Sequence, residues 1–154
     1  QLLTLASSTV SDTLDTDLIR KEILAEQLKD LKQKPEWVDG SGLSRYNLFT
    51  PLSFVQVLEK LYNEIPRKRL LNMFSTGGES GTLKNWYGSD DKPYVFAKTG
   101  TLKNNHALSG YLITNSNEIL IFSFMNNNYV KSLNKVKENM EAILEYLRNN
   151  VSMH

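Results

Sequence analysis

The sequence contains no cysteine, so it offers neither disulfide bonds nor thiolate ligands for a metal. This absence does not fix a compartment, because proteins outside the cytoplasm often lack disulfides as well. Long apolar runs are also missing, and none approaches the roughly 20 residues that a membrane-spanning helix needs. The 18 Lys and Arg residues nearly balance the 17 Asp and Glu residues, which leaves a formal net charge of +1. A charge this small cannot recruit nucleic acid or an anionic membrane by its field alone, so any bound anion must be held locally.

What is present suits one globular domain. The 154 residues are 40% hydrophobic and 23% charged, which is enough apolar material for one core. No repeat, low-complexity tract or internal boundary divides the sequence, so we treat residues 1–154 as parts of one domain. The first residue is Gln1 rather than Met, and the apolar stretch QLLTLA follows directly. We therefore expect the chain to be a part of something longer.

Helical periodicity marks both halves of the sequence. Apolar residues recur at helical spacing over residues 15–34, 51–65 and 131–149, and a short helix is expected over residues 66–74. The expected boundaries come from Asp15 or Thr16 as a cap, from Pro35 as a stop, and from Pro51 and Pro66 as helix openers.

Strand patterns lie in the second half. Residues 94–102, 107–114 and 118–125 read as strands, and the polar residues 115–117 suit a hairpin between the last two. Residues 77–93 are rich in glycine and polar side chains, which is typical of an ordered loop. The expected fold class is α+β, with an antiparallel sheet flanked by helices and the last helix lying across one face of the sheet.

The tripeptide Lys98-Thr99-Gly100 lies within the first expected strand. A lysine there supplies a positive charge, the threonine supplies a hydroxyl, and the glycine lets a ligand backbone lie close to the strand. Together these groups suit an anionic, peptide-like ligand that pairs with a strand edge. A bland interpretation is an exposed strand lysine beside a threonine that favours strands, because three letters match by chance in many proteins.

Three segments together carry a more specific signal. DGSGLSRYNL at 39–48, GGESGTL at 77–83 and AKTGTL at 97–102 occur in this order. In order and separation they resemble the D-alanyl-D-alanine carboxypeptidase/endopeptidase branch of the low-molecular-mass (class C) penicillin-binding proteins. That family belongs to the serine acyl-transferases whose signatures are S-x-x-K, an S-x-N-like element and K-T-G. The resemblance implies the C-terminal part of a penicillin-binding, serine β-lactamase-like transpeptidase domain.

The resemblance assigns catalytic roles to two residues of the first segment. Ser44 would relay a proton toward the leaving amine, and the side-chain amide of Asn47 would hold a substrate carbonyl. The element is usually S-x-N, whereas Tyr46 stands two places after Ser44 here. Either Tyr46 faces the cleft or a local turn brings Asn47 there. The alternative for Ser44 and Asn47 is that one of them caps the helix that opens near Pro51.

The resemblance assigns the remaining site residues to the K-T-G strand. Lys98 would be catalytic by stabilising developing negative charge, and Thr99 with Thr101 would bind the terminal carboxylate of a D-Ala-D-Ala stem peptide. The backbone N–H of Thr101 would form one arm of the oxyanion hole, a donor typically worth ~3 kcal/mol. Gly100 would leave room for the substrate, so a side chain there should displace it.

The family's nucleophile has no counterpart in its usual place. The family carries S-x-x-K well before the S-x-N element, whereas the matches here, at 89–92 and 132–135, both follow Ser44. We interpret both as chance matches. The chain is then the C-terminal part of a DD-peptidase domain without its nucleophile-bearing N-terminal part, and it should be inactive alone.

The other expectations follow from the implied substrate. Peptidoglycan D-Ala-D-Ala peptides and β-lactams are the implied partners, which places the protein in the periplasm or elsewhere outside the cytoplasm. No cofactor is expected, and no metal either, because neither His106 in the polar turn KNNH nor the final His154 has a second histidine or paired carboxylates at ligand spacing. Nucleic acid is not expected, while membrane association and oligomeric state stay open. Alternative functions are a β-lactamase or esterase of the same superfold, or a non-catalytic peptidoglycan-binding or interaction domain.

Overall fold

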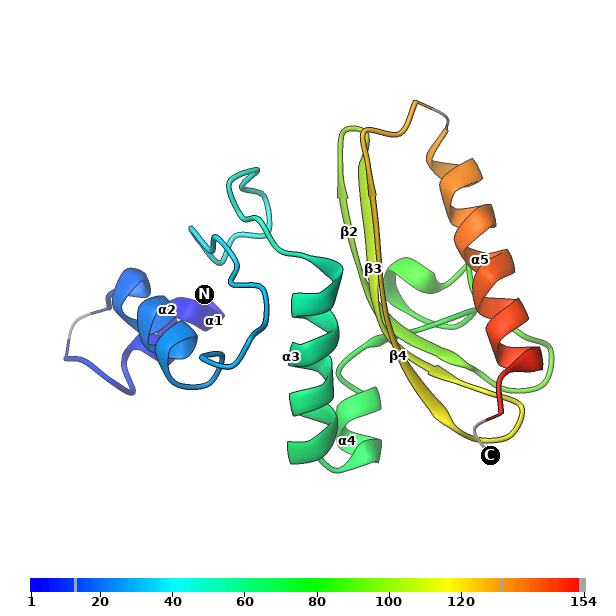
Figure 1. Cartoon of the computed structure of the whole chain (residues 1–154), viewed down its shortest axis with the longest axis horizontal. Coiled ribbons are helices and arrows are strands. Elements are labelled where there is room, and N and C mark those ends of the chain that lie inside the picture. Colours follow the sequence, from blue (N-terminus) through cyan, green and yellow to red (C-terminus); the bar gives the residue numbers. More distant parts are fainter. Residues whose placement is uncertain (13, 131, 153–154) are drawn as a thin grey trace. The chain divides into compact units, whose positions relative to one another are not determined.

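The computed structural model describes residues 1–12, 14–130 and 132–152. The chain forms two compact units, Gln1–Ser53 and Phe54–His154. The first unit is helical and irregular, whereas the second contains the sheet (Figure 1).

Two short helices open the first unit. Helix α1 spans Leu2–Ser7 and helix α2 spans Thr16–Ala25. The Asp15 carboxylate caps α2 by accepting hydrogen bonds from the backbone N–H groups of Asp17 and Leu18, which confirms one of the two expected caps. The expected continuation to residue 34 is wrong, because α2 ends at Ala25 and turns follow. The apolar residues in these turns still recur about every three positions. The sequence pattern therefore remains helix-like after the helix itself has ended.

The rest of the first unit is irregular but tied together by hydrogen bonds. Glu36 and Leu48 form an isolated antiparallel bridge that closes the segment between them into a loop. Helix α3, Pro51–Glu64, begins at the boundary between the units. The Thr50 hydroxyl accepts a hydrogen bond of 3.1 Å from the backbone N–H of Ser53 and caps α3. Thr50, rather than Ser44 or Asn47, therefore performs the capping that the sequence left open.

The second unit follows the expected order of helices and strands. Helix α4 spans Arg67–Leu71 and the final helix α5 spans Leu133–Asn150. The strands are β1 (Ser75–Thr76), β2 (Val95–Leu102), β3 (Asn105–Ile113) and β4 (Ile119–Asn127), and a 3-10 turn, η1, covers Gly81–Leu83. The three expected strands and the two later helices are confirmed, with boundaries shifted by up to three residues. The two-residue strand β1 is too short to be recognised in the sequence.

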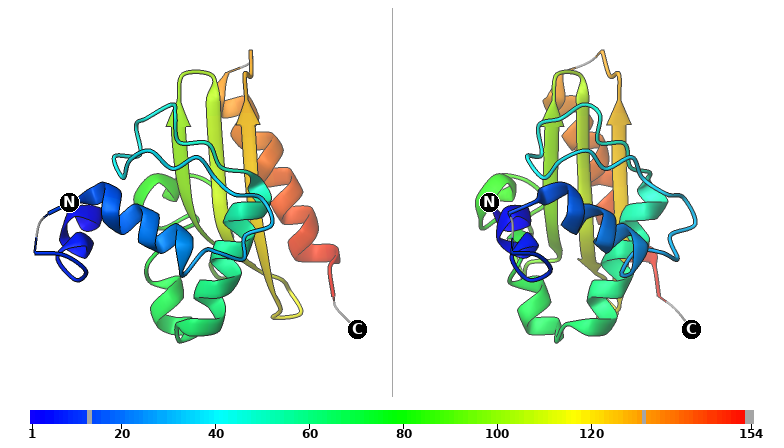
Figure 2. Two further views of the ribbon diagram at one scale, coloured as in Figure 1. Left: turned by 60° about the vertical axis from the view of Figure 1, so that its left-hand side comes forward. Right: turned by 90° about the vertical axis from the view of Figure 1, so that its left-hand side faces the viewer.

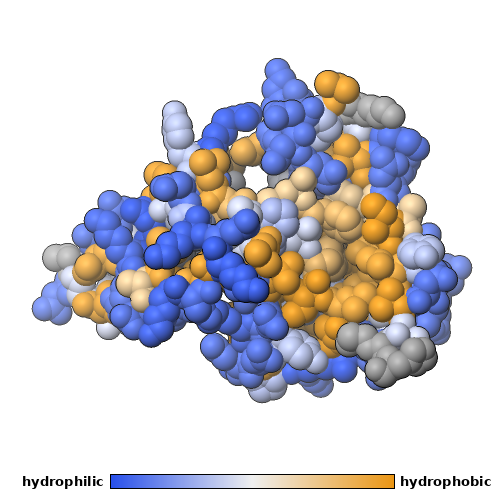
Figure 3. Space-filling model, viewed as in Figure 1, coloured by the Kyte–Doolittle hydropathy of each residue, from blue (hydrophilic) through white to orange (hydrophobic). Residues whose placement is uncertain are grey.

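The sheet is an antiparallel meander in the order β1-β2-β3-β4. Its strands lie between α3 with α4 on one face and α5 on the other (Figure 1), and the turned views show the strands side by side (Figure 2). Strand β4 is the last in the order, and apolar residues gather over it between α3 and α5 in the space-filling view (Figure 3).

Each face of the sheet has its own apolar cluster, because side chains alternate along a strand. The α5 face carries the larger cluster, to which Val95, Ala97, Leu108 and Leu112 contribute from the sheet and Val136, Met140 and Leu144 from α5. The opposite face centres on Tyr111, which packs with Leu58 and Leu70 of α3 and α4. The buried Tyr111 hydroxyl donates a hydrogen bond of 2.8 Å to the Leu58 carbonyl oxygen. The sheet thus has a packed apolar cluster on each face, and β2 contributes to the one beneath α5.

None of the helices in the described part of the chain is both long enough and apolar enough to cross a membrane.

Candidate active site

Strand β2 presents an open edge along the K-T-G motif. Strand β1 pairs only with Phe96 and Ala97, so within the described residues no strand pairs with the outer edge of β2 beyond Ala97. The Val95 carbonyl accepts a hydrogen bond from Gly77 on that outer side. Backbone groups alternate between the two edges of an antiparallel strand, so the N–H and C=O groups of Thr99 and Thr101 also point outward.

The Lys98 side chain reaches this open edge. Its ammonium donates a hydrogen bond of 2.7 Å to the carbonyl oxygen of Thr99, and the residue is exposed. The charge therefore lies beside the outward-pointing backbone groups of β2, although the side chain starts from the face that α3 and α4 cover, as its pairing with Ser109 indicates. A cation and free backbone groups at one edge are what an extended, anionic peptide needs.

The two threonine hydroxyls of the motif start from the α5 face of the sheet. The Thr99 hydroxyl donates a hydrogen bond of 2.8 Å to the hydroxyl of Thr82, which belongs to η1. The Thr101 hydroxyl lies 2.8 Å from Nδ1 of His106, its cross-strand partner on β3. Neither Thr82 nor His106 was assigned a role from the sequence, although the spacing of a two-residue hairpin would place His106 opposite Thr101.

Gly100 and Gly110 differ in what a side chain would meet. A Cβ atom on Gly100 would have only the Cβ of Ala107 nearby, at 3.9 Å, which is an ordinary contact. A Cβ atom on Gly110 would lie 2.1 Å from the Phe96 carbonyl oxygen. The packing of the sheet thus requires glycine at 110 but not at 100. The space beside Gly100 is open to the surface, as expected if an external ligand uses it.

The glycine-rich loop before β2 is ordered by close backbone contacts. Gly78 has a φ of +76°, and its added Cβ would lie 2.8 Å from the Cα of Gly88. The same loop contains Tyr87, whose side chain is fully buried in the larger apolar cluster, with Trp86 packed against that cluster. Packing, rather than a place in a cleft, therefore accounts for these two aromatic residues. The loop fixes η1, and with it Thr82, beside β2.

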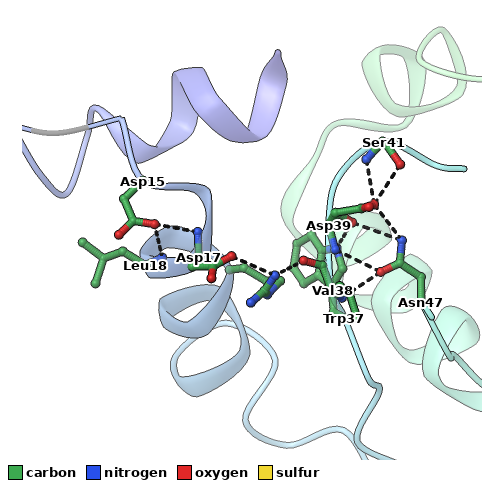
Figure 4. Close-up of polar contacts among 9 residues, drawn as sticks. Asp15, Asp17, Leu18, Trp37, Val38, Asp39, Ser41 and Asn47 are labelled. Atoms are coloured by element: carbon green, nitrogen blue, oxygen red, sulfur yellow. Dashed lines mark hydrogen bonds and ion pairs between the residues drawn. The ribbon is translucent and has the colours of Figure 1, made fainter. Parts of the chain in front are cut away.

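In the first unit, the loop between Glu36 and Leu48 is organised by Asn47 (Figure 4). Its side-chain oxygen accepts hydrogen bonds of 2.7 Å and 3.1 Å from the backbone N–H groups of Val38 and Asp39. Its side-chain nitrogen donates to the Asp39 carbonyl oxygen at 3.2 Å and to the Asp39 carboxylate at 3.1 Å. Both ends of the amide are therefore occupied. A substrate carbonyl would have to displace one of the bonds to Asp39, so the substrate role of Asn47 stays a prediction.

The Asp39 carboxylate completes this loop. It accepts hydrogen bonds from the hydroxyl and the backbone N–H of Ser41 and from the amide of Asn47, and these donors hold the pKa of Asp39 below its usual range. Arg20 of α2 forms an ion pair of 3.2 Å with Asp17 and donates a hydrogen bond to the Val38 carbonyl oxygen. Figure 4 shows this chain of contacts from α2 to Asn47.

Ser44 lies in the same loop. Its hydroxyl oxygen accepts a hydrogen bond of 3.2 Å from the backbone N–H of Tyr46, and the residue is partly exposed. A hydroxyl that accepts one bond still has its own proton to donate. Tyr46 is 76% exposed and packs into no core. The structure thus groups Ser44 with Asn47 in one unit, and Lys98 with Thr99, Gly100 and Thr101 in the other.

In both S-x-x-K matches the serine oxygen accepts a hydrogen bond from the nearby backbone. Ser132 caps α5, and its hydroxyl accepts a hydrogen bond of 3.3 Å from the backbone N–H of Lys135. The ammonium of Lys135 instead pairs with Glu138 at 2.9 Å. Ser89 lies in the loop before β2 and accepts a bond from the backbone of Asp91. Ser89 and Ser132 thus both accept hydrogen bonds from backbone N–H groups close to them in sequence.

His106 departs most from the sequence-based expectation. It belongs to β3 rather than to a polar turn, and it is only 2% exposed. Burial lowers the pKa of His106, and the charge of Lys137 on α5 lowers it further. Across the described residues, no group of three or more His, Asp or Glu side chains could hold a metal ion. His154 lies outside the described residues.

Comparison with known proteins gives a consistent set of matches. The family model described as D-Ala-D-Ala carboxypeptidase 3 (S13) matches residues 10–150. A D-alanyl-D-alanine carboxypeptidase DacB from Haemophilus influenzae is 32% identical over 114 residues, which covers 72% of this chain and 24% of the relative. A D-alanyl-D-alanine carboxypeptidase from an Actinomadura species is 38% identical over 97 residues, or 59% of this chain and 18% of the relative. The chain thus spans about a quarter or less of these relatives.

Solved structures agree in fold. Penicillin-binding protein 4 from Haemophilus influenzae, in complex with a β-lactam, superposes with a TM-score of 0.67 at 28% identity, over 87% of this chain and 31% of that chain. A penicillin G-acylated predatory endopeptidase from Bdellovibrio bacteriovorus superposes with a TM-score of 0.67 at 18% identity, over 99% of this chain and 47% of that chain. The expected α+β class and the penicillin-binding-type fold are therefore confirmed.

Proposed function

The chain belongs to the D-Ala-D-Ala carboxypeptidase 3 (S13) family, and we propose that it supplies the substrate-binding edge of a serine-type peptidase acting on D-Ala-D-Ala peptides of peptidoglycan. The observation that carries the proposal is the open edge of β2. There the Lys98 ammonium, the outward N–H of Thr101 and the unfilled space beside Gly100 occur along a few residues of one strand.

The substrate would add to this edge as an extended segment. Outward backbone groups of β2 pair with the peptide, and Gly100 leaves room for its side chains. The terminal carboxylate binds near Lys98 and accepts a hydrogen bond from the hydroxyl of Thr101, and one from the hydroxyl of Thr99 when that hydroxyl gives up its bond to Thr82. The Lys98 charge attracts the carboxylate and also stabilises negative charge that develops at the reacting carbonyl.

The reaction is acyl transfer. The hydroxyl of the serine nucleophile gives its proton to the lysine of S-x-x-K as its oxygen attacks the carbonyl carbon of the penultimate D-Ala, and the carbonyl electron pair moves onto an oxygen that the Thr101 N–H stabilises. Collapse of this intermediate breaks the peptide bond, and the leaving D-Ala amine receives a proton relayed through Ser44. Water then hydrolyses the ester and restores the serine. β-Lactams enter the same path and remain as the acyl group.

The nucleophile in this proposal comes from residues other than these 154. The contacts of the two S-x-x-K serines within the chain support this, because Ser132 caps α5 and Ser89 accepts a hydrogen bond from the backbone of Asp91. We call this chain together with its nucleophile-bearing segment the complete protein. Since peptidoglycan lies outside the cytoplasm, the complete protein would act in the periplasm or an equivalent compartment.

Labelling with a β-lactam tests the proposal. We expect the complete protein to form one covalent adduct per molecule, measured by intact mass, and to release D-Ala from a D-Ala-D-Ala peptide. The 154-residue chain alone should form no adduct. An adduct on the chain alone would overturn the assignment of the nucleophile to another segment. Absence of any adduct on the folded complete protein would favour a non-catalytic domain, and rapid turnover of nitrocefin would favour a β-lactamase.

A further inference from the structure

A buried histidine lies directly behind one of the proposed ligand-binding hydroxyls. His106 is 2% exposed, and its Nδ1 lies 2.8 Å from the Thr101 hydroxyl oxygen. Its other ring nitrogen, Nε2, is buried and has no hydrogen-bond partner among the described residues. Thr101 itself is exposed, so one side of its hydroxyl meets the protein and the other can meet a ligand.

The unpartnered Nε2 decides where the imidazole proton lies. A neutral imidazole carries one N–H and one bare nitrogen. With the proton on Nε2, the protein would bury an N–H group without an acceptor. Such donors are rarer in proteins, and cost more free energy, than a buried acceptor without a donor. With the proton on Nδ1, the N–H is paired with Thr101 and only a lone pair is left unpaired. The Nδ1–H tautomer is therefore favoured.

This tautomer determines how the Thr101 hydroxyl can bond. Because Nδ1–H donates to the Thr101 oxygen, the hydroxyl hydrogen cannot be used toward His106. It is left free to donate to a ligand on the exposed side of Thr101. A carboxylate accepts hydrogen bonds and has none to donate, so it is the matching ligand group.

We propose that His106 is a positioning residue that fixes the Thr101 hydroxyl as a hydrogen-bond donor to the terminal carboxylate of the substrate. The inference rests on the proposed function, because it takes the ligand of Thr101 to be that carboxylate. Sequence reasoning gave His106 no role, and only the pairing of β2 with β3 places it behind Thr101.

The surroundings of His106 keep the imidazole neutral. On β2 it faces the uncharged Thr101, and on β4 its cross-strand partner is the uncharged Asn126, whose amide bonds the Met140 sulfur at 3.3 Å. From α5 the charged group is Lys137, which disfavours a second positive charge and, after burial, contributes to the lowered pKa of His106.

The tautomer can be measured on the 154-residue chain itself. Long-range proton–nitrogen NMR spectra at neutral pH distinguish a protonated ring nitrogen from a bare one. We expect His106 to show a protonated Nδ1 and a bare Nε2. The reverse tautomer, or a charged ring at pH 7, would overturn the inference. This measurement does not depend on any catalytic activity.

A double-mutant cycle in the complete protein tests the effect on the ligand. We expect His106→Leu to slow acylation by a carboxylate-bearing β-lactam about tenfold, the scale of one hydrogen bond to a charged group. His106→Asn can place an amide N–H near the Nδ1 position and should recover most of the rate. In a Thr101→Val background, His106→Leu should cause little further loss, because the hydroxyl that it orients is gone.

A β-lactam with its carboxylate esterified provides the control ligand. Its acylation rate should respond weakly to His106→Leu, because it offers no carboxylate to Thr101. If the unaltered complete protein is not acylated at all, the proposed function fails. If it is acylated but His106→Leu costs as much with Thr101→Val as without it, or as much with the ester as with the acid, the positioning role fails. Should His106→Leu not fold, the tautomer measured by NMR on the unaltered chain still supports or overturns the inference.

Discussion

The ammonium of Lys98 and the carbonyl oxygen of Thr99 are joined by a hydrogen bond of 2.7 Å at the unpaired edge of β2. The bond shows that a side chain starting on the α3 face of the sheet reaches around to the edge. A ligand carboxylate at that edge would offer the ammonium a charged acceptor in place of a neutral one, which is the stronger bond. We therefore expect Lys98 to exchange this contact for a ligand carboxylate when one binds at the edge.

Replacing Lys98 tests its charge. We expect Lys98→Met to slow β-lactam acylation of the complete protein by about 10²- to 10³-fold, the range found for removing a group that stabilises the oxyanion. The melting temperature should barely change, because the side chain is exposed. Lys98→Arg keeps the charge but not its shape, so it should recover the rate only in part. Equal rates for all three proteins would contradict the role of Lys98.

Two glycines of the sheet form a matched pair. Gly100→Ala should change the free energy of unfolding by at most about 1 kcal/mol, because its Cβ has space, but it should weaken binding of a D-Ala-D-Ala peptide to the complete protein. Gly110→Ala should lower the free energy of unfolding by about 1–3 kcal/mol, because its Cβ would overlap the Phe96 carbonyl oxygen. Urea titration of the 154-residue chain measures both stabilities. A strongly destabilised Gly100→Ala would show that the fold itself needs this glycine.

The Asn47 amide should hold its loop in the absence of substrate. Asn47→Ala removes the acceptor for the N–H groups of Val38 and Asp39, so hydrogen exchange at these two amides should accelerate roughly tenfold, the scale of about 1–2 kcal/mol. Ser41→Ala is the control, because it removes a bond to the Asp39 carboxylate but leaves the two amides paired with Asn47. Unchanged exchange in Asn47→Ala would mean that the bridge between Glu36 and Leu48 suffices.

The burial of His106 should make stability depend on pH in a known direction. Its folded pKa lies below the ordinary value of about 6.5, so near and below that pH the unfolded chain binds a proton that the folded chain does not. The free energy of unfolding should therefore fall as pH drops from about 7 through the unfolded pKa, and level off below the folded pKa. His106→Asn should flatten this part of the profile. A variant with the same slope as the unaltered chain would assign the effect to other groups.

Local patterns predicted local elements well. The alternation over residues 94–125 identified the three longer strands, and the prolines at 51 and 66 located the starts of α3 and α4. The same kind of pattern failed after Ala25, where turns repeat apolar residues at nearly helical spacing. It also missed β1, because a strand of two residues is too short to show an alternation of apolar and polar side chains.

The candidate site was predictable only in part. The motif letters pointed to Lys98, Thr99, Gly100 and Thr101, and these residues do share one exposed strand end. The partners Thr82 and His106 were missed because each becomes a neighbour only when η1 and β3 fold beside β2. The polar residues around His106 in the sequence made it resemble a turn residue. In the structure it lies opposite Thr101 in the pairing of β2 with β3, and its side chain is on the face of the sheet that α5 covers.

The sequence by itself determined the longer strands and the starts of the later helices, the order of the motifs and the family, because each depends on residue types at fixed separations along the chain. Only the tertiary structure decided that the outer edge of β2 is unpaired, that Gly110 rather than Gly100 is demanded by packing, and that a buried imidazole backs Thr101. These properties arise where segments distant in sequence meet, and no local pattern encodes which atoms will face each other there.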